Sequence, residues 1–73
     1  MLGAIRTLIV DDSATLRAML DVVISGERDF RSPVHAANAF QAMDILAKRG
    51  FDLVLLDINM PGMDGLQLLD HIV

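Results

Sequence analysis

Apolar residues along the chain form short continuous runs that alternate with stripes at helical spacing. Residues 7–10 (TLIV) and residues 51–56 (FDLVLL) are runs rich in branched and apolar side chains, which predict buried strands. Residues 33–37 (PVHAA) form a weaker strand candidate, because Pro33 fits only the first position of a strand or a sheet edge. We therefore expect three strands.

Each predicted strand is followed by a segment with helical spacing. Ser13 can cap a helix that ends near Gly26, and its apolar stripe comprises Leu16, Met19, Leu20, Val23 and Ile24. Asn38 and Gln41 have the spacing of a capping box for a second helix, whose stripe comprises Ala39, Ala42, Met43, Leu46 and Ala47. Residues 60–65 (MPGMDG) predict a turn that leads into a third helix.

Three strand–helix units in succession are typical of the α/β class, in which helices cover both faces of a parallel sheet. No internal repeat or linker divides the chain, so we expect a single domain over residues 1–73. Hydrophobic residues make up 53% of the sequence, and the 5 glycines raise the apolar share above the roughly 45–50% of ordinary domains. The excess indicates that some layers covering the strands lie outside this chain.

Charge and residue types narrow the possible classes of protein. The net charge of −4 disfavours nucleic acid and anionic membranes as partners. The absence of cysteine excludes a disulfide framework and a thiolate metal site. Arg6 interrupts the apolar start of the chain, so no signal peptide is expected, and no run approaches the roughly 18 apolar residues of a membrane span. We expect a cytoplasmic protein.

Two of the predicted strands end in aspartate. Asp11 and Asp12 follow residues 7–10, and Asp57 follows residues 51–56. In open parallel sheets, sites form beyond the carboxyl ends of the strands, so neighbouring first and third strands would bring the three carboxylates together. At a separation of about 5 Å and an effective dielectric constant near 20, each pair of like charges costs about 3 kcal/mol. A small domain requires compensation for such a cost.

A divalent cation would supply this compensation. Because the candidate ligands are oxygens without His or Cys beside them, Mg²⁺ is favoured over Zn²⁺, and Ca²⁺ would require more ligands. Mg²⁺ bound in this way commonly also contacts phosphate oxygens. A structural alternative stays open, in which Asp11 and Asp12 start a loop or cap a helix and Asp57 caps a turn. The sequence has no Gly-rich turn after residues 7–10, which excludes a dinucleotide fingerprint and a P-loop.

The remaining polar residues receive structural interpretations. His35 and His71 lie on different elements, and no acid or serine accompanies either in a triad-like arrangement. Arg17 and Lys48 are expected on solvated helix faces. Asn59 is expected in a turn, where its carbonyl can point towards the acidic residues.

Three stretches, LIVDDSATLR, AANAFQAMDIL and FDLVLLDINMPGMDG, carry a resemblance to a known family. From Ile5 onward the chain resembles the N-terminal part of a response regulator receiver domain of two-component signalling, of the chemotaxis and methylesterase-linked type. The resemblance implies a flavodoxin-like parallel sheet with strand order 2-1-3. Complete receivers add two further strand–helix units, with a Ser or Thr and a Lys that have no counterpart here. We therefore expect residues 1–73 to form an incomplete receiver domain.

The resemblance also implies roles for individual residues. Asp57 would accept a phosphoryl group from a histidine kinase or a small phosphodonor. Asp11 and Asp12 would hold Mg²⁺, and Asp57 and the backbone carbonyl of Asn59 would complete its protein ligands. The chain would then be a phosphorylated signalling domain and not a turnover enzyme. The alternatives are an interaction or oligomerisation fragment that is not phosphorylated, and an aspartyl-phosphate hydrolase, which requires a second acid where this sequence has Asn59.

The third predicted strand affects association. In the strand order 2-1-3, residues 53–58 form an apolar edge of the sheet. An apolar edge strand invites pairing with another chain. We therefore expect a homo-oligomer that forms through this edge or by exchange of elements.

Overall fold

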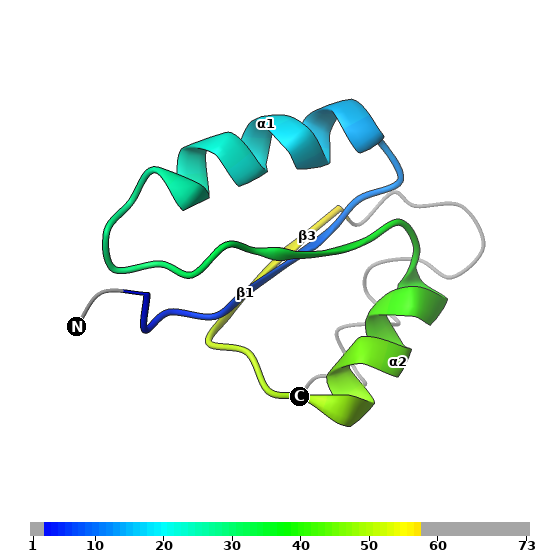
Figure 1. Ribbon diagram of the computed structural model, residues 1–73. Coiled ribbons are helices and arrows are strands. Elements are labelled where there is room, and N and C mark those ends of the chain that lie inside the picture. The colour runs from blue at the N-terminus through cyan, green and yellow to red at the C-terminus, as the bar shows by residue number, and fades with distance from the viewer. Residues whose placement is uncertain (1–2, 58–73) are drawn as a thin grey trace.

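The computed structural model describes residues 3–57, which form three strands and two helices (Figure 1). The elements in chain order are β1 (Thr7–Val10), α1 (Ala14–Ser25), β2 (Val34–Ala36), α2 (Ala39–Lys48) and β3 (Leu53–Leu56). The strands are parallel and lie in the order β2-β1-β3. The α/β class and the strand order expected from the sequence are therefore confirmed. The predicted turn at residues 60–65 and the helix after it lie outside the described residues.

The central position of β1 explains its fully apolar sequence. Its residues Leu8, Ile9 and Val10 are 0% exposed, because a neighbouring strand lies on each side and a helix on each face. Figure 1 shows α1 on one side of the sheet and α2 on the other. Leu8 and Val10 face α2, where the core cluster is completed by Ala36, Ala39 and Ala42. Burying each large aliphatic side chain contributes about 1.5–3 kcal/mol, so β1 anchors the fold.

Both helices begin at the caps that the sequence predicts. The Ser13 hydroxyl accepts a hydrogen bond from the Leu16 N–H at 3.2 Å, and the Asn38 side chain accepts one from the Gln41 N–H at 2.8 Å. The Gln41 side chain completes the cap of α2, because it accepts a hydrogen bond from the Ala37 N–H at 2.7 Å. At the other end of α1, Gly26 adopts a right-handed conformation with φ −77°, so this glycine ends the helix without a left-handed turn.

A charged contact joins the amino ends of β1 and β3. The Asp52 carboxylate accepts hydrogen bonds from the backbone N–H of Arg6 at 3.0 Å and from its guanidinium at 3.2 and 3.3 Å. The Arg6 carbonyl in turn accepts the N–H groups of Asp52 and Leu53. These contacts turn the chain into β3, which starts at Leu53, two residues later than the apolar run predicts.

The Arg6–Asp52 contact generates a prediction about acid stability. Hydrogen bonds from the Arg6 side chain, and then from its backbone N–H, hold the pKa of Asp52 below its ordinary value. A lowered folded-state pKa contributes stability above the unfolded-state pKa, and this contribution is lost as the pH falls through the folded-state value. We expect Asp52→Asn to lower the unfolding free energy at pH 7 and to flatten its decline below about pH 4.

Urea denaturation at a series of pH values measures this effect. Arg6→Met should give a smaller flattening, since it removes the guanidinium donors and leaves both the acid and the backbone N–H donor of residue 6 in place. A decline below pH 4 as steep in both variants as in the unmodified chain would contradict the assignment.

Candidate functional site

The pairing of β1 with β3 sets the position of three acidic residues. Val10 is the register partner of Leu56 in the parallel pair of β1 and β3. Asp11 and Asp57, the residues that follow them, therefore both lie at the carboxyl end of the sheet. The Asp57 N–H donates to the Val10 carbonyl at 3.0 Å, and the Asp11 N–H donates to the Ala36 carbonyl at 3.1 Å. Both aspartates are thus fixed by backbone hydrogen bonds that extend the sheet.

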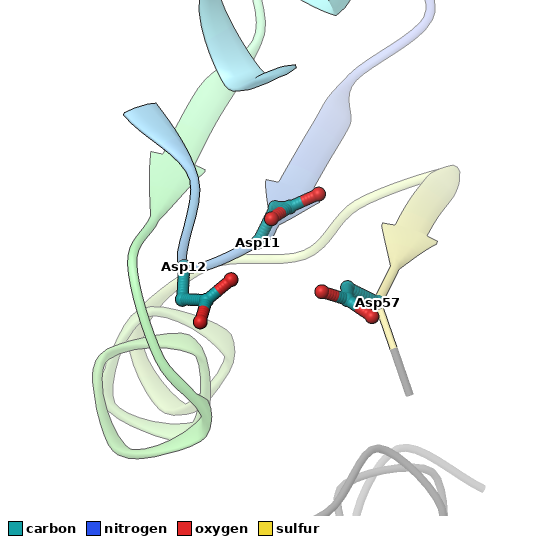
Figure 2. Close-up of side chains that lie close together, drawn as sticks. All are labelled: Asp11, Asp12 and Asp57. Carbon is teal, nitrogen blue, oxygen red and sulfur yellow. The ribbon is translucent and has the colours of Figure 1, made fainter. Parts of the chain in front are cut away.

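The carboxylates of Asp11, Asp12 and Asp57 converge beyond this edge (Figure 2). Each residue offers an oxygen that lies within 4.8 Å of the oxygens of the other two. Asp11 is 8% exposed, Asp12 is exposed and Asp57 is partly buried. The convergence expected from the strand pattern is therefore present in the fold, and we refer to these three residues as the acidic cluster.

The acidic cluster concentrates negative charge at the edge of the sheet. At separations near 5 Å, each pair of like charges costs between about 1 and 3 kcal/mol, the lower value applying where water screens the pair. Asp12 lies on the solvent side, while the buried Asp11 receives a hydrogen bond on one carboxylate oxygen from the Ser13 N–H at 2.9 Å. This hydrogen bond is the one expected from the structural alternative, in which Asp11 starts a loop, and it occupies one of the two carboxylate oxygens. A carboxylate has acceptor capacity for more than one partner, so a second role is compatible with it.

Arg17 is the residue near this site whose role the sequence prediction missed. Its guanidinium Nη1 donates to the Asp11 backbone carbonyl at 2.6 Å, and its side chain is partly buried. The expectation of a solvated Arg17 is therefore wrong, because α1 starts close enough to the acidic residues for a long side chain in its first turns to reach back. Lys48, in contrast, is 71% exposed and pairs with Asp44, as expected for a helix surface.

The histidine expected to be structural has a local partner. His35 on β2 contacts Asp21 on α1, with 2.6 Å between Nε2 and Oδ2. The hydrogen bond with His35, and then the one from the Ser25 hydroxyl, hold the pKa of Asp21 below its ordinary value. This pair links α1 to β2 away from the acidic cluster. His71 and Asn59 lie outside the described residues.

The acidic cluster offers the donors that a small hard cation requires. Mg²⁺ binds oxygens at about 2.0–2.1 Å in an octahedron, so neighbouring and opposite ligand atoms lie roughly 3–4 Å apart. Carboxylate oxygens already within 4.8 Å of one another reach that spacing by small side-chain rotations. The candidate ligands that converge here within residues 3–57 are all aspartates. A set of ligands made only of carboxylate oxygens suits Mg²⁺ better than Zn²⁺. The residues present therefore fit the cation that the sequence prediction named.

None of the helices in residues 3–57 is long and apolar enough to cross a membrane.

Comparisons with known proteins agree with this geometry. The family described as "Response regulator receiver domain" matches residues 7–73. Sporulation initiation phosphotransferase F of Bacillus subtilis is 45% identical over 64 residues, which cover 88% of this chain and 50% of that protein. Protein-glutamate methylesterase/protein-glutamine glutaminase 2 of Pseudomonas aeruginosa is 39% identical over 69 residues, covering 94% of this chain and 20% of that protein.

Solved structures show the same fold. A chain from the complex of histidine kinase ThkA with response regulator TrrA superimposes with a TM-score of 0.83 at 34% identity, covering 93% of this chain and 57% of that one. A chain from the complex of the CheA3 P1 domain with CheY6 from R. sphaeroides gives a TM-score of 0.78 at 40% identity, covering 94% and 54%.

The chain thus spans between a fifth and about half of the length of these relatives. Over the span that it covers, it shares the fold of the two solved structures. This chain belongs to the family of response regulator receiver domains.

Proposed function

We propose that the chain is a phosphoacceptor module of two-component signal transduction, in which Asp57 receives the phosphoryl group. The observation that carries the proposal is the acidic cluster, in which three carboxylates from two strand ends lie within 4.8 Å of one another in a receiver-family fold. Asp57 follows the third strand directly and its backbone N–H donates to the Val10 carbonyl, so the backbone that carries its carboxylate is held at the end of the sheet. Proximity of this kind is the main source of rate in phosphoryl transfer.

The proposed cofactor is Mg²⁺, held by Asp11, Asp12 and Asp57 together with the backbone carbonyl of Asn59. When bound, the ion would offset the charge of the carboxylates and of the phosphoryl oxygens. The hydrogen bond from Ser13 orients Asp11, while Arg17 holds the backbone carbonyl of the same residue. These two contacts fix the loop on which two of the proposed ligands lie.

The proposed chemistry of the chain itself is nucleophilic. An oxygen of Asp57 attacks phosphorus, a new P–O bond forms, and the bond between phosphorus and the donor breaks with its electron pair going to the donor. The product is an acyl phosphate on Asp57. Because the carboxylate keeps the group, the reaction is a stoichiometric modification and the chain is proposed to act as a signalling domain and not as a turnover enzyme.

The donor follows by analogy with the structural relatives. Those relatives come from complexes with a histidine kinase and with the CheA3 P1 domain. We therefore propose that a histidine kinase, or a small phosphodonor, supplies the phosphoryl group to Asp57. A cytoplasmic location is proposed on the same basis.

A variant of the exposed acid tests the cation site. Asp12→Asn removes one of three like charges, so it should raise the melting temperature of the metal-free chain. The same change should weaken the stabilisation by Mg²⁺, which for the unmodified chain amounts to about 2.7 kcal/mol at 100 times its Kd. Thermal unfolding with and without Mg²⁺ measures both effects.

The matched control for this prediction is Glu27→Gln, which removes an exposed acid in the loop after α1. It should leave the response to Mg²⁺ intact. Equal responses to Mg²⁺ in Asp12→Asn, Glu27→Gln and the unmodified chain would contradict a cation site at the acidic cluster.

Mass spectrometry tests the phosphoacceptor. Incubation with a small acyl phosphate and Mg²⁺ should add one phosphoryl group to the chain, and Asp57→Asn should abolish this addition because it removes the nucleophile. Asp44→Asn, an exposed acid on α2, should be modified like the unmodified chain.

Three other outcomes would each contradict the proposal in a different way. Modification of Asp57→Asn would place the acceptor elsewhere. Continued release of free phosphate would indicate an aspartyl-phosphate hydrolase. Stabilisation by Mg²⁺ without modification would indicate an interaction module that is not phosphorylated.

A further inference from the structure

Two features of Arg17 reduce the stability of its surroundings. Arg17 lies near the amino end of α1, where the helix dipole favours an acid over a cation, and the first turn of this helix contains no acidic residue. The Nε atom of Arg17 is buried and has no hydrogen-bond partner among residues 3–57. A buried donor without a partner destabilises a fold. Helix stability therefore gives no reason for an arginine at this position.

The acid of α1 that lies one turn from Arg17 is engaged elsewhere. Asp21 follows Arg17 at the i, i+4 spacing at which opposite charges on a helix commonly pair. Its Oδ2 instead contacts the His35 Nε2 at 2.6 Å, and its Oδ1 accepts a hydrogen bond from the Ser25 hydroxyl at 2.9 Å. With both Asp21 oxygens engaged, the Arg17 side chain extends back towards the loop that precedes α1.

In that loop, Arg17 binds the backbone between two residues of the acidic cluster. Its Nη1 donates to the Asp11 carbonyl at 2.6 Å, a short hydrogen bond from a charged donor in a partly buried place. This carbonyl belongs to the planar peptide group that joins Asp11 to Asp12. On the other side of Asp11, its N–H donates to the Ala36 carbonyl of β2. The backbone is thus held on both sides of Asp11.

The peptide group that Arg17 holds decides where Asp12 can reach. Asp12 is exposed, so few neighbours restrict its short side chain and its backbone sets the direction of its carboxylate. Figure 2 shows the carboxylates of Asp12 and Asp57 pointing towards one another. A rotation of the peptide group between Asp11 and Asp12 would turn the Asp12 carboxylate away from this position.

We propose that Arg17 is a positioning residue that increases the affinity of the acidic cluster for Mg²⁺, because it holds the peptide group between Asp11 and Asp12. This inference rests on the proposed function. The positive charge of Arg17 acts in the opposite direction, since it repels a cation. That repulsion is screened by water and salt at the exposed side of the cluster, whereas the hydrogen bond is short and partly buried. Positioning therefore outweighs repulsion.

Isothermal titration calorimetry with Mg²⁺ tests the direction and the origin of the effect. Arg17→Met keeps an apolar stem and removes both the donor and the charge. It should raise the Kd for Mg²⁺ by about tenfold, as loss of a group that orients metal ligands commonly does. The factor should be the same at about 0.05 M and about 0.5 M KCl, because salt screens charge repulsion far more than a buried hydrogen bond.

Two further variants accompany this titration. Arg17→Lys keeps a charged donor on a differently shaped side chain, so it should raise the Kd by a smaller factor than Arg17→Met. Arg28→Met is the matched control, since it removes the same charge from an exposed arginine in the loop after α1. It should leave the Kd unchanged.

Amide hydrogen exchange without metal tests the positioning itself. The Ser13 N–H donates to the Asp11 carboxylate at 2.9 Å and reports on the order of this loop. In Arg17→Met, its exchange should accelerate by about tenfold in the absence of Mg²⁺, because the loop has lost a hydrogen bond from a charged donor. Arg28→Met should exchange at this amide like the unmodified chain.

The outcomes separate this inference from the proposed function. If the unmodified chain binds Mg²⁺ and Arg17→Met binds it equally well, with only a lower melting temperature, Arg17 has a structural role alone and the inference is wrong. Tighter binding by Arg17→Met that disappears at high salt would show that repulsion dominates, which also overturns it. An unmodified chain that does not bind Mg²⁺ would overturn the proposed function and the inference together. If Arg17→Met does not fold, an unchanged Kd and unchanged Ser13 exchange in Arg17→Lys overturn the inference.

Discussion

The parallel pairing of β1 with β3 is the constraint on which the rest of the structure depends. It buries Leu8, Ile9 and Val10 completely, and the same register carries Asp11 and Asp57 to one edge of the sheet. The hydrophobic effect thus supplies the free energy that holds like charges together. The burial of β1 and the position of the acids both depend on this one register, so a change of register would remove both.

The two ends of the sheet manage charge in opposite ways. At the amino end, Arg6 and Asp52 neutralise each other and join β1 to β3 directly. At the carboxyl end, the structure gathers three acids, and the Arg17 guanidinium donates to the backbone carbonyl of Asp11. Three acids this close together reduce the stability of a small domain, and a cluster of like charges is typical of a site adapted to bind a ligand.

Most of the fold was predictable, because its signals are local. The run at residues 7–10 gives the limits of β1, and Ser13 and Asn38 mark both helix starts through hydrogen bonds to residues three positions away. The convergence of the acidic cluster followed from strand order alone. Arg17 was misjudged because its partner is a backbone carbonyl in a loop, and a sequence pattern carries no sign of such a contact. The predicted ligand Asn59 lies outside the described residues.

A crystal structure of the chain grown with Mn²⁺, a hard cation that replaces Mg²⁺ and can be located by its anomalous scattering, tests the central claim most directly. We expect a single ion at the end of the sheet, in direct contact with carboxylate oxygens contributed by both β1 and β3, from Asp12 and Asp57, with Asp11 bound directly or through water. Ions bound to single carboxylates at separate places, or a sheet edge where Asp57 points away from Asp11 and Asp12, would contradict the account.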